Sequence, residues 1–281
     1  MVYLWTKFAD IAIPWRTILR RSPEEKELLK LYWNELKKMK RQKTVRIISL
    51  IGILLPAFCT VLCINSNYRF RNLVSMNVEF GSFLIAPFIF SVLLLTLFTL
   101  EEQNDTLKNI LTIGISQHKL FLVKMVAALT FVVLFAVINT VYTMIGGIFL
   151  KNYTPDFLRV FGILLITMSA SVAGTMPVVL VIALLRKKDL IAMIAVNCFV
   201  LVNFLFMWQI SMLHCLNLHF PILIAYRITY PISILEYTEN LQMGLNALYY
   251  PTGKGIFILA MTVIISIVLG IEICKRQEVS R

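Results

Sequence analysis

The chain has 281 residues, of which 59% are apolar and 15% are charged, and its mean hydropathy is +0.80. Soluble domains average about 45–50% apolar and about 25% charged residues, so the composition excludes an ordinary water-soluble protein. The net charge of +12 does not indicate nucleic-acid binding, because the basic residues gather before the first long apolar run and at the ends of later ones, where they would meet anionic lipid headgroups.

Residues 1–46 form a basic segment ahead of the first apolar run. Ser22 suits the N-cap of a helix and Pro23 suits its first turn. Apolar residues within 22–41 fall on one stripe with most lysines off it, which predicts an amphipathic helix on the cytoplasmic membrane surface. Residues 1–21 mix aromatic and basic side chains, and either lie on the same surface or form a loosely ordered extension.

Six apolar stretches within residues 47–273 are each long enough to cross a hydrocarbon core of about 30 Å. They lie near residues 47–64, 81–100, 125–150, 160–185, 190–213 and 255–273. We therefore predict an all-α polytopic membrane protein, because helices satisfy their own backbone hydrogen bonds in lipid. Pro56, Pro87 and Pro177 fall inside these stretches, which membrane helices tolerate.

The distribution of lysine and arginine predicts the orientation. With the N-terminus inside, twenty-one of these residues lie on the cytoplasmic side and six outside, so both termini, including the tail at 274–281, are expected in the cytoplasm. Residues 214–254 contain an apolar stretch interrupted by prolines and an arginine. A seventh crossing there would move Lys275 and Arg276 outside, so we expect extracellular re-entrant helices before the last span.

The loop at 101–124 joins the second and third stretches. Two glutamates end the second stretch, and Asp105 or Thr106 can cap a short helix that carries three apolar residues and ends at Gly114. A short amphipathic helix flanked by charges suits docking of a soluble partner, although an ordinary surface helix has the same pattern.

The residues of this loop resemble a known family. A glutamate is followed by Asn-x-Thr-Leu-Lys, by Ile-Leu, by Gly-Ile-Ser with a basic residue, and then by Lys124. This run resembles the coupling-helix region of type-2 ATP-binding-cassette (ABC-2 type) permeases, and it is similar to the permease subunits that protect bacteria against lantibiotics and bacitracin. Asp105 stands where that group commonly has Gly, and Gly114 where it commonly has Pro. The resemblance also covers the architecture expected for residues 22–276.

The resemblance implies two protein partners. In that family the coupling helix sits in a groove of a separate ATP-binding-cassette ATPase subunit, and two permeases, identical or related, face one another. The residues expected to contact or position the ATPase are Glu101, Glu102, Asn104, Thr106, Leu107, Lys108 and Leu111. The chain has no Gly-x-x-x-x-Gly-Lys-Ser/Thr loop, so ATP and magnesium are expected on the partner subunit and no catalytic residue is expected here.

Other polar residues do not form a recognised catalytic or metal site. The five cysteines include no Cys-x-x-Cys pair, and the spacing of His214, Cys215 and His219 matches no class of metal site, so neither a metal nor a cofactor is expected in this chain. Polar residues inside the apolar stretches either hydrogen-bond between helices or line a substrate path. The candidates for the path are Asn139, Thr143, Ser171, Thr175, Asn197 and Asn203.

Three functions are compatible with a chain of this kind. The resemblance implies the permease subunit of an ATP-driven exporter in the bacterial plasma membrane, which moves or removes a lantibiotic, a bacitracin-like peptide or another amphiphile or lipid and gives immunity or resistance. A secondary transporter or channel is the alternative, but the interiors expected for the third to fifth spans hold no Asp, Glu, Lys, Arg or His for ion coupling. A membrane enzyme would need a nucleophile, a base and an orienting group, and no such set is visible.

Overall fold

The computed structural model describes residues 23–40, 42–103, 117–151, 153, 156–185, 188–208, 220–233 and 248–279. The helices among them are α3 (Pro23–Lys40), α4 (Lys43–Asn65), α5 (Phe70–Met76), the π-helix η1 (Asn77–Ile85), α6 (Ala86–Gln103), α8 (Gln117–Gly147), α9 (Phe157–Gly174), α10 (Val178–Leu185), α11 (Asp189–Trp208), α13 (Pro221–Ser233) and α15 (Thr252–Val279). In this described part no β-strand is present, and one isolated bridge pairs Arg69 with Lys151.

Six helical stretches of the described residues are long and apolar enough to cross a membrane. They are Val45–Asn65, Phe70–Leu100, His118–Gly147, Phe157–Gly174, Leu190–Trp208 and Thr252–Arg276. The prediction of an all-α polytopic membrane protein with six spans is therefore confirmed. Large apolar side chains are exposed along α4, α11 and α15, as expected for helices whose outer faces are solvated by lipid.

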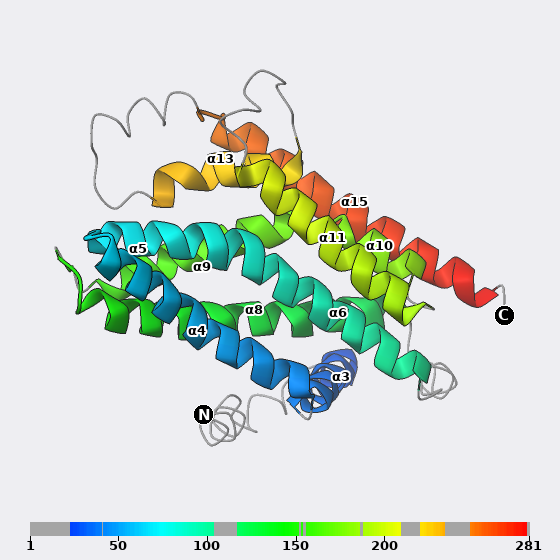
Figure 1. Cartoon of the computed structure of the whole chain (residues 1–281). Helices are drawn as coiled ribbons and strands as arrows, with labels where there is room; N and C mark the ends of the chain where they lie inside the picture. The colour runs from blue at the N-terminus through cyan, green and yellow to red at the C-terminus, as the bar shows by residue number, and fades with distance from the viewer. Residues whose placement is uncertain are drawn as a thin grey trace.

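The helices lie side by side and define two ends of the bundle (Figure 1). We call one of them the basic end, because it carries Lys43 at the start of α4, Lys119 at the start of α8, Lys188 before α11 and Lys275 near the end of α15. The connections between α4 and α5 and between α8 and α9 lie at the opposite end. The backbone N–H of Phe70 donates to the carbonyl of Lys151 at 3.2 Å and ties these two connections together.

The second span is a continuous helical run of α5, η1 and α6 that begins at Phe70, well before the start near Gly81 that the apolar run suggests. Apolar side chains at Phe70, Leu73 and Val74 are buried, so the early turns have a packed face despite their polar neighbours. In η1 the N–H of Ala86 bonds to the carbonyl of Gly81, five residues back. Pro87 follows at once, and its missing N–H and bulky ring disfavour regular α-helical bonding here.

The fourth apolar stretch, expected as a single run over 160–185, is divided into α9 and α10 by a turn that contains Pro177. Gly174 ends α9 where the chain of α13 passes very close. A Cβ atom at Gly174 would lie 2.8 Å from the Cα atom of Ile222. The absence of a side chain at Gly174 therefore lets the start of α13 rest directly on the end of α9.

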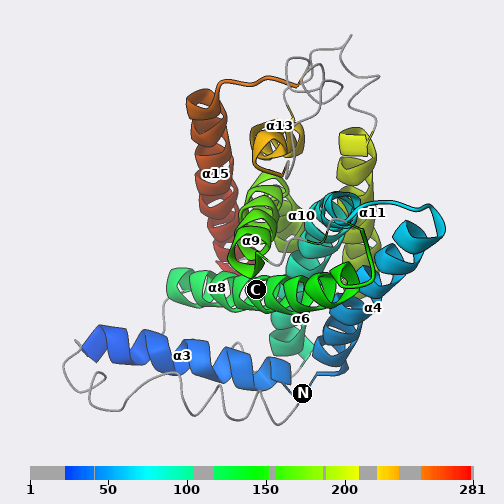
Figure 2. The same cartoon turned by 90° about the vertical axis from the view of Figure 1, so that its left-hand side faces the viewer.

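The described part of residues 214–254 includes α13, which has 13 residues and is about 20 Å long at 1.5 Å per residue. This is too short to cross a membrane. Its first turn is buried at Ile222, Leu223, Ile224 and Ala225. Figures 1 and 2 show α13 beside α9, towards the end of the bundle opposite the basic end.

Helix α3 crosses the basic end of the bundle and lies steeply inclined to α4 and α6 (Figure 2). It packs on α8, where the hydroxyl of Tyr32 lies 2.8 Å from that of Thr130. Met39 is fully buried on the same helix. This placement suits a helix that follows the membrane surface, which remains a prediction for α3.

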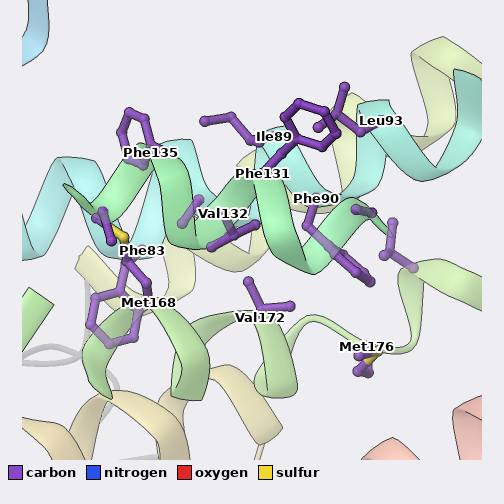
Figure 3. Packing of buried hydrophobic residues seen from close by; sticks show 14 of the residues in the cluster. Phe83, Ile89, Phe90, Leu93, Phe131, Val132, Phe135, Met168, Val172 and Met176 are labelled. Carbon is purple, nitrogen blue, oxygen red and sulfur yellow. The ribbon is translucent and has the colours of Figure 1, made fainter. Parts of the chain in front are cut away.

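Helix α8 forms the centre of the core. Phe131, Val132 and Phe135 on α8 pack between side chains of η1 and α6 on one side and of α9 on the other (Figure 3). The neighbouring side chains labelled there are Phe83, Ile89, Phe90, Leu93, Met168 and Val172. Close packing of this kind fixes the second, third and fourth spans against one another, and it positions the polar residues described next.

Candidate functional site

The residues expected to meet the ATPase lie at or beyond the edge of the described structure. Glu101 and Glu102 belong to the last turn of α6, but their side chains are outside the description. Asn104, Thr106, Leu107, Lys108 and Leu111 lie in residues 104–116, which are outside the described residues. The structure therefore shows the two helices that border this segment, α6 before it and α8 after it.

Lys124 connects these two bordering helices. Its side chain on α8 is 0% exposed, and its Nζ donates to the backbone carbonyl of Leu97 on α6 at 2.5 Å. The same Nζ lies 4.7 Å from the centroid of the Phe98 ring, which itself packs on Phe121 with ring centroids 5.5 Å apart. The carbonyl oxygen of Leu97 and the face of the Phe98 ring both favour a cation at this place. We call Lys124, Leu97, Phe98 and Phe121 the lysine clamp.

The candidate path residues form separate local pairs. On α8, the hydroxyl of Thr143 donates to the carbonyl of Asn139 at 2.7 Å and lies 3.1 Å from its Oδ1. At the end of α9, the hydroxyl of Thr175 donates to the carbonyl of Ser171 at 3.0 Å. All four residues are buried.

The other two candidates, Asn197 and Asn203, are half-buried on α11. Asn203 donates to the carbonyl of Phe199 at 2.8 Å. No hydrogen bond among the described residues joins the α8 pair, the α9 pair and the α11 asparagines, so the structure does not bring the six together into one polar group. Their role in a substrate path stays a prediction.

Polar contacts between helices occur instead around η1. The hydroxyls of Ser82 on η1 and Thr167 on α9 are 2.8 Å apart. On another side of η1, Gly81 lies against the side chain of Asn139, whose Nδ2 would be 2.8 Å from a Cβ atom at Gly81. These contacts fix the rotation of η1 between α8 and α9.

An acidic residue that sequence reasoning missed lies on η1. Glu79 falls outside the expected stretch at 81–100 but inside the apolar helical run Phe70–Leu100, where it is half-buried. It comes roughly 13 Å along the helix from Phe70 at 1.5 Å per residue. A carboxylate at such a position is costly and commonly functional.

Two tyrosines of α13 accompany Glu79. Burial, and after it the nearby Glu79 carboxylate, raise the pKa of both Tyr226 and Tyr230, so both phenols stay neutral. The rings of Phe83 and Tyr226 meet edge to face with centroids 5.3 Å apart, and those of Tyr226 and Tyr230 lie 5.7 Å apart. We call Glu79, Phe83, Tyr226 and Tyr230 the outer cluster. The sequence contains one signal for this cluster: Tyr226 and Tyr230 are spaced one helical turn apart.

The fold defines a multi-pass membrane protein, and its lysine clamp borders the loop between the second and third spans. Residues 31–203 match the family described as ABC-2 family transporter protein, and this range is more than half of the chain. The chain therefore belongs to the ABC-2 transporter family: it is the membrane component of an ABC transporter and works with an ATP-binding-cassette subunit. A comparison with curated proteins finds no match.

Proposed function

We propose that this chain is the permease subunit of an ATP-driven exporter of the lantibiotic-immunity and bacitracin-resistance group. It acts in the bacterial plasma membrane, where it moves or removes a peptide antibiotic or another amphiphile. The observation that supports this most is the family match, whose range 31–203 includes the loop at 101–124 with its coupling-helix motif.

ATP is hydrolysed on a separate subunit in this proposal, with magnesium bound there. Glu101, Leu107 and Leu111 meet that subunit at the basic end, which faces the cytoplasm together with both termini, as the lysine and arginine bias favours. Movement of the docked segment reaches the membrane domain through α6 and α8. The lysine clamp supports this route, because it holds the two helices together beside the segment.

A second permease, identical or related, completes the translocation path. The exposed apolar faces of α4, α11 and α15 are available to lipid or to that second subunit. An amphiphile that enters from the bilayer can reach the bundle without leaving the apolar phase, which suits a transporter that clears such molecules from the membrane.

Docking is tested with the full chain, tagged and purified from its own cells with the ATPase that accompanies it. We expect Leu107→Asp and Leu111→Asp to abolish copurification of the ATPase, because a charge replaces an apolar contact in the groove. Leu107→Met is the matched control, since it keeps an apolar side chain of similar volume. Undiminished copurification with both aspartate variants, in protein that still inserts in the membrane, would contradict the proposed docking.

The substrate is tested by drug sensitivity. Expression of the chain with its ATPase in a sensitive bacterium is expected to raise the inhibitory concentration of a lantibiotic or of bacitracin. An ATPase variant unable to hydrolyse ATP is the control, and it should remove the protection. Protection that survives in this control would favour the alternative, a secondary transporter or channel.

A further inference from the structure

The outer cluster presents an acidic group without a cationic partner among the described residues. No hydrogen bond or ion pair within this part of the chain reaches the carboxylate of Glu79. The basic residue of α13, Arg227, has a buried Nε that is also without a hydrogen-bond partner in the described residues. The segments that flank α13 outside the description, 209–219 and 234–247, contain neither lysine nor arginine. A carboxylate inside an apolar helical run is expensive unless an opposite charge accompanies it or it takes up a proton, so a cationic ligand beside Glu79 would be favoured.

The groups around Glu79 suit one kind of cation. Tyr226 and Tyr230, both half-buried, supply two aromatic rings whose faces attract cations and two hydroxyl oxygens that accept hydrogen bonds, while the fully buried Phe83 packs edge to face on Tyr226. A calcium ion takes six to eight oxygen ligands and magnesium demands near-octahedral oxygens, whereas a single carboxylate faces this cluster. Rings combined with one carboxylate match an organic ammonium group instead.

The surrounding helices hold the outer cluster in place. The bond between Ser82 and Thr167 and the contact of Gly81 with Asn139 set the rotation of η1, which carries Glu79 and Phe83. The close approach at Gly174 fixes α13, which carries both tyrosines. The π-helical run itself is a feature that occurs frequently at functional sites.

We propose that Glu79, Tyr226 and Tyr230, with Phe83 packed behind Tyr226, form a binding site for the ammonium group of an amphiphile. The site lies towards the end opposite the basic end, where α13 carries the two tyrosines and η1 of the second span carries Glu79. This proposal rests on the proposed function in one respect only: the ammonium group is taken to be part of the transported molecule. The ammonium belongs either to a cationic peptide or to the headgroup of an aminophospholipid, and it binds the site by the same chemistry in both.

The binding test uses the purified full chain in alkyl maltoside micelles, which contain no ammonium group, and labelled dodecyltrimethylammonium as the probe. We expect saturable binding by the wild type. Glu79→Gln should weaken binding roughly tenfold or more, because the opposite charge is lost in a low-dielectric site. Glu272→Gln is the matched control, since Glu272 is an exposed carboxylate on α15 paired with Arg276 at 3.2 Å, and it should bind as the wild type does.

A second pair of variants distinguishes the effect of losing the aromatic rings from a general effect on folding. Tyr226→Leu with Tyr230→Leu should weaken binding, whereas Tyr226→Phe with Tyr230→Phe keeps the ring faces and should keep most of it. These variants also test the site if Glu79→Gln fails to fold. Equal binding by the wild type, Glu79→Gln and the double leucine variant, each eluting as a monodisperse particle, would overturn the proposal.

Competition identifies the source of the ammonium. Displacement of the probe by short-chain phosphatidylethanolamine supports a lipid headgroup, and displacement by a lysine-containing lipopeptide supports a cationic peptide. No ATPase is present, so a failure of ATPase docking or of drug protection leaves this result untouched. Absence of saturable probe binding by the wild type, together with intact ATP-dependent protection, would overturn the site and leave the proposed function standing.

Discussion

Lys124 places an ammonium group in the apolar contact between two helices. A hydrogen bond from a charged donor is worth about 1.5–3 kcal/mol, more than a neutral one. The bond to Leu97 therefore makes the end of α6 follow the start of α8. The sequence shows this lysine as the last basic residue of a loop, whereas the structure shows it buried inside α8.

Replacement of Lys124 tests the lysine clamp. Lys124→Met keeps an unbranched side chain one atom shorter and removes the donor, so we expect the thermal unfolding midpoint to fall by several degrees and antibiotic protection to fall, while the ATPase still copurifies. Lys275→Met is the control, because Lys275 is exposed at the same end of the bundle. Full protection and an unchanged midpoint in the Lys124 variant would show that the lysine clamp has no role in coupling.

Helix α13 depends on the end of α9 for its position. The two helices touch through backbone at Gly174, so the contact has no room for a side chain. Gly162 lies on the same helix with no atom within 4 Å of the place its Cβ would take. The pair provides an internal comparison, because both substitutions to alanine raise helix propensity but only one creates a clash.

The two glycines are expected to respond in opposite directions. Gly174→Ala should lower the free energy of unfolding by about 1–3 kcal/mol, because the new methyl group pushes the start of α13 away. Gly162→Ala should be neutral or stabilising by up to about 1 kcal/mol. Thermal unfolding of both variants in the same detergent measures the difference. If Gly174→Ala is as stable as Gly162→Ala, α13 does not rest on α9 as described.

At the scale of elements, the second span shows where sequence reasoning stops. Its apolar part is evident from the run that ends near Leu100, because lipid requires about 20 apolar residues. The start of this span is not evident from the sequence, because charged residues such as Arg71 and Glu79 are typical of a loop. Contacts from α8, α9 and α13, which are distant in sequence, make those turns helical and set the π-helical register.

The whole molecule was predictable in its class, its number of spans and its family. The six apolar runs predict the class and the number of spans directly, and the motif in the loop at 101–124 indicates the family. Of the candidate functional residues, only those of the coupling-helix motif at 101–124 could be predicted from the sequence, and their role stays a prediction. The outer cluster was not predictable, since Glu79 and Tyr226 are far apart in the chain and only the path of α13 brings them together.

The backbone hydrogen bond between Phe70 and Lys151 has a consequence for the substitutions that position 151 tolerates. It joins an amide to a carbonyl, so the identities of both side chains are irrelevant to it. Position 151 can exchange lysine for an acidic or uncharged residue, and thereby alter the charge of that rim, while the two connections stay joined. The direct way to break this link by a single substitution is proline at position 70, which has no amide hydrogen to give.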